Sequence, residues 1–292
     1  IDRRLRRLGY QIDFRMTECA GDGARLGREA VSAGVDEVVV VGGDGTLNEV
    51  VNGLFAATHG EPPEQIVSIL PAGTGRDFSR SIGLTSFDHA LETIGDGDVQ
   101  RIDIGRIDYP GPDGALTRYF VNAADVGIGA ETAALLNRSS KLLGGKLSYM
   151  IGAARTIFRF QGRPARITVD GEIVHDGPLA MVCLANGRYH AGGMRMAPGA
   201  SMQDGLLDVL VLRNIPKYAL LGSLLPSVYV GRHIRHPAVS HHLGSVVEVT
   251  SADALPFEVD GEQPGTTNIH AEVQPGALQV RVPTRVHTES KH

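Results

Sequence analysis

A glycine-rich acidic turn stands between an apolar run and an amphipathic segment, and its residue types suit a phosphorylated nucleotide. Four valines at residues 38–41 precede Gly42-Gly43-Asp44-Gly45-Thr46, and apolar residues then recur at helical spacing from Leu47 onward. The valine run predicts a buried strand and the later spacing predicts a helix. Backbone N–H groups at the start of a helix bind anions. Asp44 would repel a bare phosphate, so the pattern favours a polyphosphate carrying Mg²⁺.

Spacing excludes two other phosphate-binding loops. The Walker A loop requires a following Gly-Lys-Ser/Thr, and the dinucleotide fingerprint requires a third glycine at a spacing that this chain lacks. The remaining alternative is a turn without a ligand. Such a turn would not need glycine on both sides of an acid after a buried strand.

The segment GGDGTLNEVVNGL at residues 42–54 resembles the nucleotide loop of the diacylglycerol kinase catalytic-domain family. That family includes bacterial diacylglycerol and other lipid kinases, with sphingosine and ceramide kinases as relatives. Residues 69–80 are similar to its PxGTxNDFAR motif, with Arg76 where the family usually has Asn. Residues 186–208 resemble its NG…GGG…P…DGLL signature, and residues 259–262 resemble its LDGE motif. The four motifs occur in the family's order over nearly the whole chain.

The resemblance implies an ATP site and two cation sites. ATP would contact Thr17, Gly42, Gly43, Asp44, Gly45, Thr46, Leu47, Asn48 and Thr74. Asp44 and Asp103 would serve the catalytic Mg²⁺. A second, structural Mg²⁺ would be held by the Asp204 carboxylate and the backbone carbonyls of Ser201 and Leu206, all oxygen ligands. A plain Asp-Gly turn is the alternative for this last segment.

Asp260 and Glu262 are the candidates for the base that phosphoryl transfer to an alcohol requires. Taken from the residues alone, Val-Asp-Gly-Glu at residues 259–262 favours an exposed hairpin turn. The family resemblance implies instead that Glu262 accepts the proton. Asp260 would then either orient Glu262 or act as the base itself.

The first third of the chain alternates strand and helix patterns, which predicts a parallel sheet with helices on both faces. Strands are expected at residues 10–16, 38–41 and 67–70, and helices at residues 22–33 and 48–57. This Rossmann-like α/β domain is expected over residues 1–103, with residues 284–292 returning to it. Thr17, the glycine turn and Thr74 then fall at the carboxyl ends of strands, where such sheets bind ligands. Family members usually begin with one more strand, which this sequence does not contain.

The rest of the chain shows short strands between turns, which predicts an antiparallel β-sandwich over residues 104–283. The expected strands are residues 101–107, 118–122, 165–169, 179–184, 207–212, 246–250, 257–259, 269–273 and 278–282. A helical pattern at residues 146–160 favours a helix that covers the sandwich, with contact to lipid as the alternative. The polar tail at residues 287–292 is expected to be disordered.

The composition of the chain argues against several classes of partner and cofactor. The chain has 292 residues and a formal net charge of −5, without a long basic block, so nucleic acid is not an expected partner. Its two cysteines lack CxxC spacing, which favours a reduced cytoplasmic protein. His233, His236 and the pair at residues 241–242 have no Cys or acid at zinc-ligand spacing, so no zinc site is expected.

We therefore expect an ATP- and Mg²⁺-dependent lipid kinase that phosphorylates the hydroxyl of diacylglycerol or a similar lipid alcohol. It would be cytoplasmic and would contact the inner membrane surface transiently, because its acceptor lies there. The oligomeric state stays open, with a homodimer among the alternatives. Two other functions compete with this one. One is a soluble nucleotide kinase of the NAD-kinase type. The other is a non-catalytic nucleotide- or lipid-binding relative, which Arg76 would favour.

Overall fold

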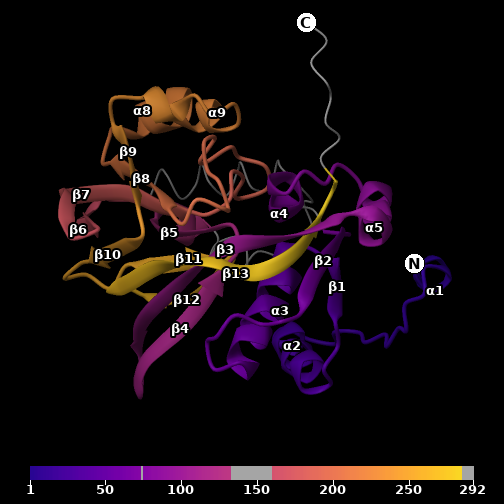
Figure 1. Cartoon of the computed structure of the whole chain (residues 1–292). Coiled ribbons are helices and arrows are strands. Elements are labelled where there is room, and N and C mark those ends of the chain that lie inside the picture. Colours follow the sequence, from indigo (N-terminus) through magenta and orange to yellow (C-terminus); the bar gives the residue numbers. More distant parts are fainter. Residues whose placement is uncertain (74, 133–159, 285–292) are drawn as a thin grey trace, which may run out of the picture. The chain divides into compact units, whose positions relative to one another are not determined.

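The computed structural model describes residues 1–73, 75–132 and 160–284, and the chain divides into two compact units (Figure 1). The first unit contains Ile1–Gly73, Ser79–Ile102 and Ala277–His292. The second contains Thr74–Phe78 and Asp103–Gly276. The chain thus leaves the first unit twice and returns to it at Ser79 and at Ala277.

The first unit is built on a parallel sheet, as the alternating pattern predicts. Strand β1 (Glu37–Gly42) pairs in parallel with β2 (Ile66–Pro71), and β2 pairs in parallel with the last part of β13 (Ile269–Val282). The strands expected at residues 269–273 and 278–282 are therefore one continuous strand, and its end lies in the first unit rather than in the sandwich. A partly buried ion pair between Arg281 and Glu37, at 2.7 Å, fixes this end of β13.

Helices pack on this sheet through their apolar faces. Helix α3 (Asp44–Ala57) buries Leu47, Val50, Val51 and Leu54 and packs against β1 and α2 (Asp22–Ser32). Both carboxylate oxygens of Glu49 on α3 accept hydrogen bonds from backbone N–H groups of Gly21 and Gly23, so Glu49 caps the start of α2. The remaining helices of this part are α1 (Asp2–Arg7) and α5 (Phe87–Asp96), which packs on β2. Helix α4 (Asp77–Ser81) begins in the second unit and ends in the first.

The strand expected at residues 10–16 is wrong. This segment forms no strand in the structure, and Phe14 and Met16 are each 71% exposed. Alternating apolar residues predict a strand only where a neighbouring strand supplies backbone partners and a covered face. Among the described strands, β1 pairs with β2 alone, and residues 10–16 do not pair with the other edge of β1. Thr17 consequently does not end a strand.

The second unit is a β-sandwich, as predicted. Strand β3 (Asp98–Gly111) starts in the first unit and enters the second at Asp103, where it pairs antiparallel with β4 (Gly114–Phe120). One series of hydrogen-bonded strands runs β12-β11-β5-β7, and β7 continues both to β8-β9 and to β6-β10-β13. These strands are β5 (Ala123–Gly127), β6 (Arg163–Val169), β7 (Glu172–Ala185), β8 (Leu207–Arg213), β9 (Val239–Gly244), β10 (Val246–Thr250), β11 (Pro256–Val259) and β12 (Glu262–Thr266).

Alternate residues of these strands face two different environments. Val126, Val182 and Phe257 belong to the large core inside the sandwich. Their sequence neighbours point to the opposite face, where Cys183 packs with Met194 and Met196 of the segment that follows β7. Short helices follow β8, namely α8 (Lys217–Ala219), a π-helical turn (Leu220–Leu224), α9 (Leu225–Val228) and a 3₁₀ turn (His233–Arg235). The outer face of β5, β7 and β11 is therefore a buried surface.

Some expectations fall outside the described residues: Thr74, the helical pattern at residues 146–160 apart from Phe160, and the tail at residues 287–292. Among the residues that the structure does describe, no helix is both long and apolar enough to cross a bilayer.

The two cysteines are expected to differ sharply in reactivity. Cys19 is exposed, whereas burial raises the pKa of the Cys183 thiol to about 12 and keeps it protonated. An alkylating reagent at neutral pH should therefore modify one thiol per native chain and both in denaturant, as mass spectrometry would show. In a Cys19→Ser variant the native chain should stay unmodified, and rapid labelling of that variant would contradict the burial of Cys183.

Candidate active site

The glycine-rich turn at the end of β1 is shorter than expected. Strand β1 includes Gly42, and α3 already begins at Asp44, so Gly43 alone joins them. Gly43 is the N-cap residue in an extended conformation and offers no side-chain acceptor to the first turn. Asp44 therefore lies in the first helical turn, where the helix dipole favours a negative charge or a bound anion.

Two of the residues assigned to ATP have buried side chains. Leu47 and Asn48 are fully buried on α3, and the Asn48 side-chain oxygen accepts a hydrogen bond from Asn52 at 3.1 Å. Gly45 and Thr46 complete the first turn, and Thr46 packs against Gly42. Any contact of Leu47 or Asn48 with a nucleotide would have to come from the backbone.

The loop after β2 lies directly against the β1–α3 junction. The N–H groups of Ala72 and Gly73 both point to the carbonyl oxygen of Gly42, at 3.0 and 3.2 Å. A Cβ atom on Gly73 would lie 2.6 Å from the Gly43 Cα, so this approach requires glycine at position 73, whereas a Cβ on Gly43 would lie at an ordinary contact distance of 3.4 Å from the Gly73 Cα. The structure thus brings the two glycine motifs of the sequence together at the carboxyl ends of adjacent parallel strands. Thr17, in contrast, lies in the exposed segment before α2.

Arg76 adopts a left-handed backbone conformation, with φ of 58°. Asparagine enters this region more readily than other non-glycine residues, which gives a conformational reason for the family's preference for Asn here. The next residue, Asp77, is buried and accepts a hydrogen bond from the Gly192 N–H at 2.7 Å. The second motif therefore also anchors the loop that follows β7.

Arg76→Asn is expected to raise the free energy of unfolding by on the order of 1 kcal/mol, because Asn relieves the left-handed strain. ATP affinity should change only modestly, through the loss of one positive charge. Denaturant unfolding and calorimetric ATP titration would measure both effects. Complete loss of nucleotide binding would identify Arg76 as an integral ligand.

The residues assigned to magnesium in the second unit do converge. The buried Asp103 carboxylate accepts hydrogen bonds from the N–H groups of Gly205 and Gly276, both at 2.8 Å. Asp103 thereby contacts the turn that carries Ser201, Asp204 and Leu206. In that turn the exposed Asp204 side chain accepts from the Leu206 N–H at 3.2 Å, as in an ordinary Asp-Gly turn. A cation role for these residues stays a prediction.

The Asp-Gly-Glu segment forms a two-residue hairpin between β11 and β12, in which Val259 is opposite Glu262. Asp260 and Gly261 both have positive φ, 46° and 95°, as a type I′ turn requires. Unlike an ordinary turn residue, Asp260 is only 7% exposed. Its carboxylate accepts three backbone N–H groups, from Val121 at 2.7 Å, Asn122 at 3.0 Å and Ala123 at 3.1 Å. Asp260 therefore fixes the hairpin to the start of β5.

Asp260→Asn is expected to lower the free energy of unfolding by on the order of 1–3 kcal/mol, because an amide nitrogen would face a buried N–H group. Denaturant unfolding would measure this loss. Asp253→Asn, at an exposed position of the same unit, should leave stability within about 0.5 kcal/mol. Equal stability of Asp260→Asn and the wild type would mean that these three hydrogen bonds carry no net free energy.

Glu262 has different partners from Asp260. Its carboxylate forms a close ion pair with Arg118 on β4, and its side chain is 37% exposed. A solvent-accessible carboxylate on a fixed hairpin can approach a substrate hydroxyl, whereas the Asp260 carboxylate is already engaged by the backbone.

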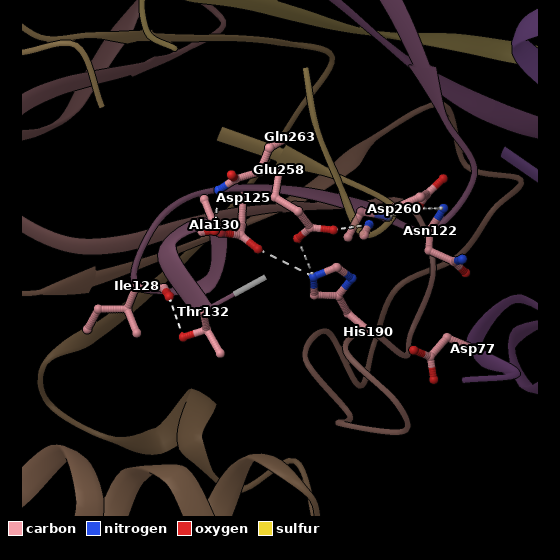
Figure 2. Close-up of polar contacts among 12 residues, drawn as sticks. Asp77, Asn122, Asp125, Ile128, Ala130, Thr132, His190, Glu258, Asp260 and Gln263 are labelled. Carbon is pink, nitrogen blue, oxygen red and sulfur yellow. Dashed lines mark hydrogen bonds and ion pairs between the residues drawn. The ribbon is translucent and has the colours of Figure 1, made fainter. Parts of the chain in front are cut away.

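A second cluster beside this hairpin was not anticipated from the sequence. Figure 2 shows the His190 ring directed at Asp125 and Glu258, with its Nε2 atom 3.4 Å from Asp125 Oδ2 and 3.0 Å from Glu258 Oε2. All three residues are buried. Glu258 also accepts a close hydrogen bond from the Gly261 N–H, so the cluster adjoins the Asp-Gly-Glu turn. The one signal in the sequence is that Glu258 lies two residues before Asp260, next to the Asp-Gly-Glu motif.

Burial and mutual interaction shift the protonation of this cluster. Loss of hydration raises the pKa of Glu258 to about 8, although His190 opposes the shift. Burial disfavours the His190 cation. Attraction to Glu258 and hydrogen bonds to both carboxylates outweigh this effect of burial, so the pKa of His190 is raised well above its ordinary value. The protein surroundings therefore favour the protonated forms of Glu258 and His190.

Both parts of the chain match known protein families. Residues 1–107 match the diacylglycerol kinase catalytic domain, and residues 122–282 match the YegS C-terminal NAD kinase beta sandwich-like domain. A probable lipid kinase YegS-like from Chromohalobacter salexigens is 34% identical over 290 residues, which cover 96% of this chain and 86% of that protein. The chain belongs to the family of diacylglycerol kinases and YegS-like lipid kinases.

Other members of this family are similar over most of their length. Lipid kinase YegS of Escherichia coli K12 is 31% identical over 281 residues, covering 96% of this chain and 89% of the relative. Diacylglycerol kinase of Staphylococcus carnosus is 29% identical over 263 residues, covering 90% and 81%. The crystal structure of a diacylglycerol kinase from Bacillus anthracis shares the fold, with a TM-score of 0.70 at 21% identity over 96% of this chain and 88% of that one. The family resemblance read from the motifs is confirmed, and it places the chain among the kinases.

Proposed function

We propose that this protein transfers the γ-phosphoryl group of Mg²⁺-bound ATP to the hydroxyl group of a lipid alcohol, with diacylglycerol as the first candidate. The observation that carries the proposal is the similarity to lipid kinases over almost the full chain, in both of its parts. The family motifs lie at the ends of strands and in turns, where side chains and backbone can serve a ligand rather than only a core.

The first unit supplies a phosphate cradle in this proposal. The first turn of α3 presents backbone N–H groups and the positive end of the helix dipole, and Gly43 and Gly73 keep side chains away from this junction. Asp44 in that turn would serve the Mg²⁺ that accompanies ATP, directly or through water. Asp103 is the second candidate for the catalytic cation, and the Ser201, Asp204 and Leu206 turn is the candidate for the structural one.

The second unit supplies the candidate base. Glu262 would accept the proton of the lipid hydroxyl as the oxygen attacks the γ-phosphorus, while ADP leaves. Arg118 and the hairpin hold the Glu262 carboxylate in place, and Asp260 holds the hairpin. A lipid acceptor would require a transient contact with a membrane surface. We therefore propose a peripheral location at the inner membrane surface.

The proposal can be tested with the purified chain, Mg²⁺-ATP and acceptors in mixed micelles. Diacylglycerol, phosphatidylglycerol and a sphingoid base would be compared with NAD and with micelles lacking an acceptor, by following ADP formation and the phosphorylated lipid. We expect ADP formation that depends on a lipid alcohol. Phosphorylation of NAD would favour a nucleotide kinase. ATP binding without turnover on any acceptor would favour a non-catalytic relative.

A further inference from the structure

The Asp125, His190 and Glu258 cluster described above has no role in the proposed phosphoryl transfer. We propose that these three residues form a binding site for one first-row divalent transition-metal ion, with Zn²⁺ and Mn²⁺ as the candidates. This ion would be separate from the Mg²⁺ that accompanies ATP. The inference concerns the second unit alone and does not depend on the identity of the phosphoryl acceptor.

The donor set and its spacing suit such an ion. One ligand atom from each residue lies within 4.8 Å of the other two. The two measured edges of this triangle, 3.0 and 3.4 Å, are close to the roughly 3.3 Å separating ligands that each lie about 2.0–2.1 Å from a tetrahedral Zn²⁺. An imidazole nitrogen with two carboxylates is typical of Zn²⁺, Mn²⁺ or Fe²⁺, whereas Mg²⁺ prefers oxygen ligands alone.

The strand register fixes the two carboxylates side by side. Glu258 on β11 is the direct antiparallel partner of Asp125 on β5, so both side chains project from the same face of the sheet. Like charges placed directly opposite each other destabilise a sheet unless a cation or protons lie between them. The chain nevertheless buries both carboxylates, with Asp125 and Glu258 each 2% exposed.

His190 is held over this pair by a strained loop. Backbone hydrogen bonds of 3.0 Å run in both directions between His190 and Met194, which closes the loop. Ala191 within it has a φ of 53°, a left-handed conformation that costs a residue with a side chain on the order of 1 kcal/mol. Such strain persists where the surroundings require one geometry, and here it presents the imidazole to the carboxylates.

A further observation points to a missing ligand. Asp125 Oδ1 is a buried atom without a hydrogen-bond partner among the described residues, although buried carboxylate oxygens are normally paired. Gly129 lies against this carboxylate, and a Cβ there would come within 2.4 Å of its oxygens, so no side chain occupies the space. A metal ion bound by both oxygens of the Asp125 carboxylate would engage the unpaired Oδ1 as well as Oδ2.

The test is metal binding by the chelator-treated full chain, measured by calorimetric titration with Zn²⁺, Mn²⁺ and Mg²⁺ and by elemental analysis after gel filtration. We expect one tightly bound Zn²⁺ or Mn²⁺ per chain and a higher unfolding temperature when that ion is present. His190→Gln should weaken binding by more than the roughly 10–100-fold that loss of an outer-shell partner causes. His241→Gln is the matched control, because it removes a histidine that pairs with a single carboxylate, Asp208, at 2.6 Å. This variant should bind the ion with the affinity and stoichiometry of the wild type.

Two additional measurements keep the test decisive if His190→Gln fails to fold. Glu258→Gln preserves shape and should also lose the ion. Co²⁺ added to the wild-type chain should give the intense visible absorption of a four- or five-coordinate site, and excess Zn²⁺ should abolish it. Absence of stoichiometric binding by the wild type, or equal binding by wild type, His190→Gln and Glu258→Gln, would overturn the proposal and leave a buried hydrogen-bonded cluster without a metal role.

Discussion

Glu262→Gln is expected to lower lipid-dependent phosphoryl transfer by about 10²–10⁴-fold while ATP binding persists. The amide keeps the size of the side chain and part of its hydrogen bonding to Arg118, but it cannot accept the proton of the attacking hydroxyl. ATP affinity should be retained because the proposed phosphate cradle belongs to α3 in the first unit. A lipid kinase assay together with calorimetric ATP titration would separate the two effects.

Glu272→Gln provides the matched control for this experiment. Glu272 lies on β13 in the second unit and also pairs with an arginine, Arg106, at 3.1 Å. Loss of that carboxylate should leave turnover near the wild-type value. Wild-type turnover in Glu262→Gln would mean that the hairpin serves only as a turn. Joint loss of activity and ATP binding would instead place the hairpin at the nucleotide and make Asp260 the first candidate for the base.

Local sequence patterns predicted those elements of the fold that a single short segment determines. The valine run before Gly42 and the apolar spacing after Leu47 predicted β1 and α3, because one short segment contains both the periodicity and the turn. At residues 10–16 the prediction from the sequence pattern failed. Alternating apolar and polar residues show which side chains could share a face, but a strand also needs a neighbouring strand, and no described strand pairs with this segment.

The residues of the candidate site also differ in how far the sequence alone could indicate them. Asp44 and the Asp-Gly-Glu hairpin lie in contiguous motifs, so the sequence alone could propose them as candidates. The three backbone N–H groups that hold Asp260 come from residues more than 130 positions earlier, which no local motif indicates. The Asp125, His190 and Glu258 cluster was missed because its members come from three distant segments. Only the pairing of β5 with β11, and the loop closed by His190 and Met194, place them together. Cross-strand register of this kind is a tertiary property that periodicity does not encode.

Asp44→Asn is expected to lower turnover by orders of magnitude without unfolding the protein. The carboxylate is proposed to serve the cation that neutralises the transferring phosphate, and a neutral amide cannot replace its charge. The structural cost should be small, because an acid in the first turn of a helix contributes only about 0.3–1 kcal/mol through the helix dipole. Turnover measured over a series of Mg²⁺ concentrations, with denaturant unfolding in parallel, would test both statements.

Asp22→Asn separates the cation role of Asp44 from a role as a helix-start acid. Asp22 lies in the first turn of α2 and accepts a hydrogen bond from the Glu18 N–H at 2.7 Å, so its loss should cost stability to a similar degree. It has no proposed contact with phosphate or cation, and its turnover should match that of the wild type. If Asp44→Asn also kept near-wild-type turnover at limiting Mg²⁺, the acid in the glycine turn would be a helix-start residue only. The cation of the reaction would then have to be held from the second unit, where Asp103 is the remaining candidate.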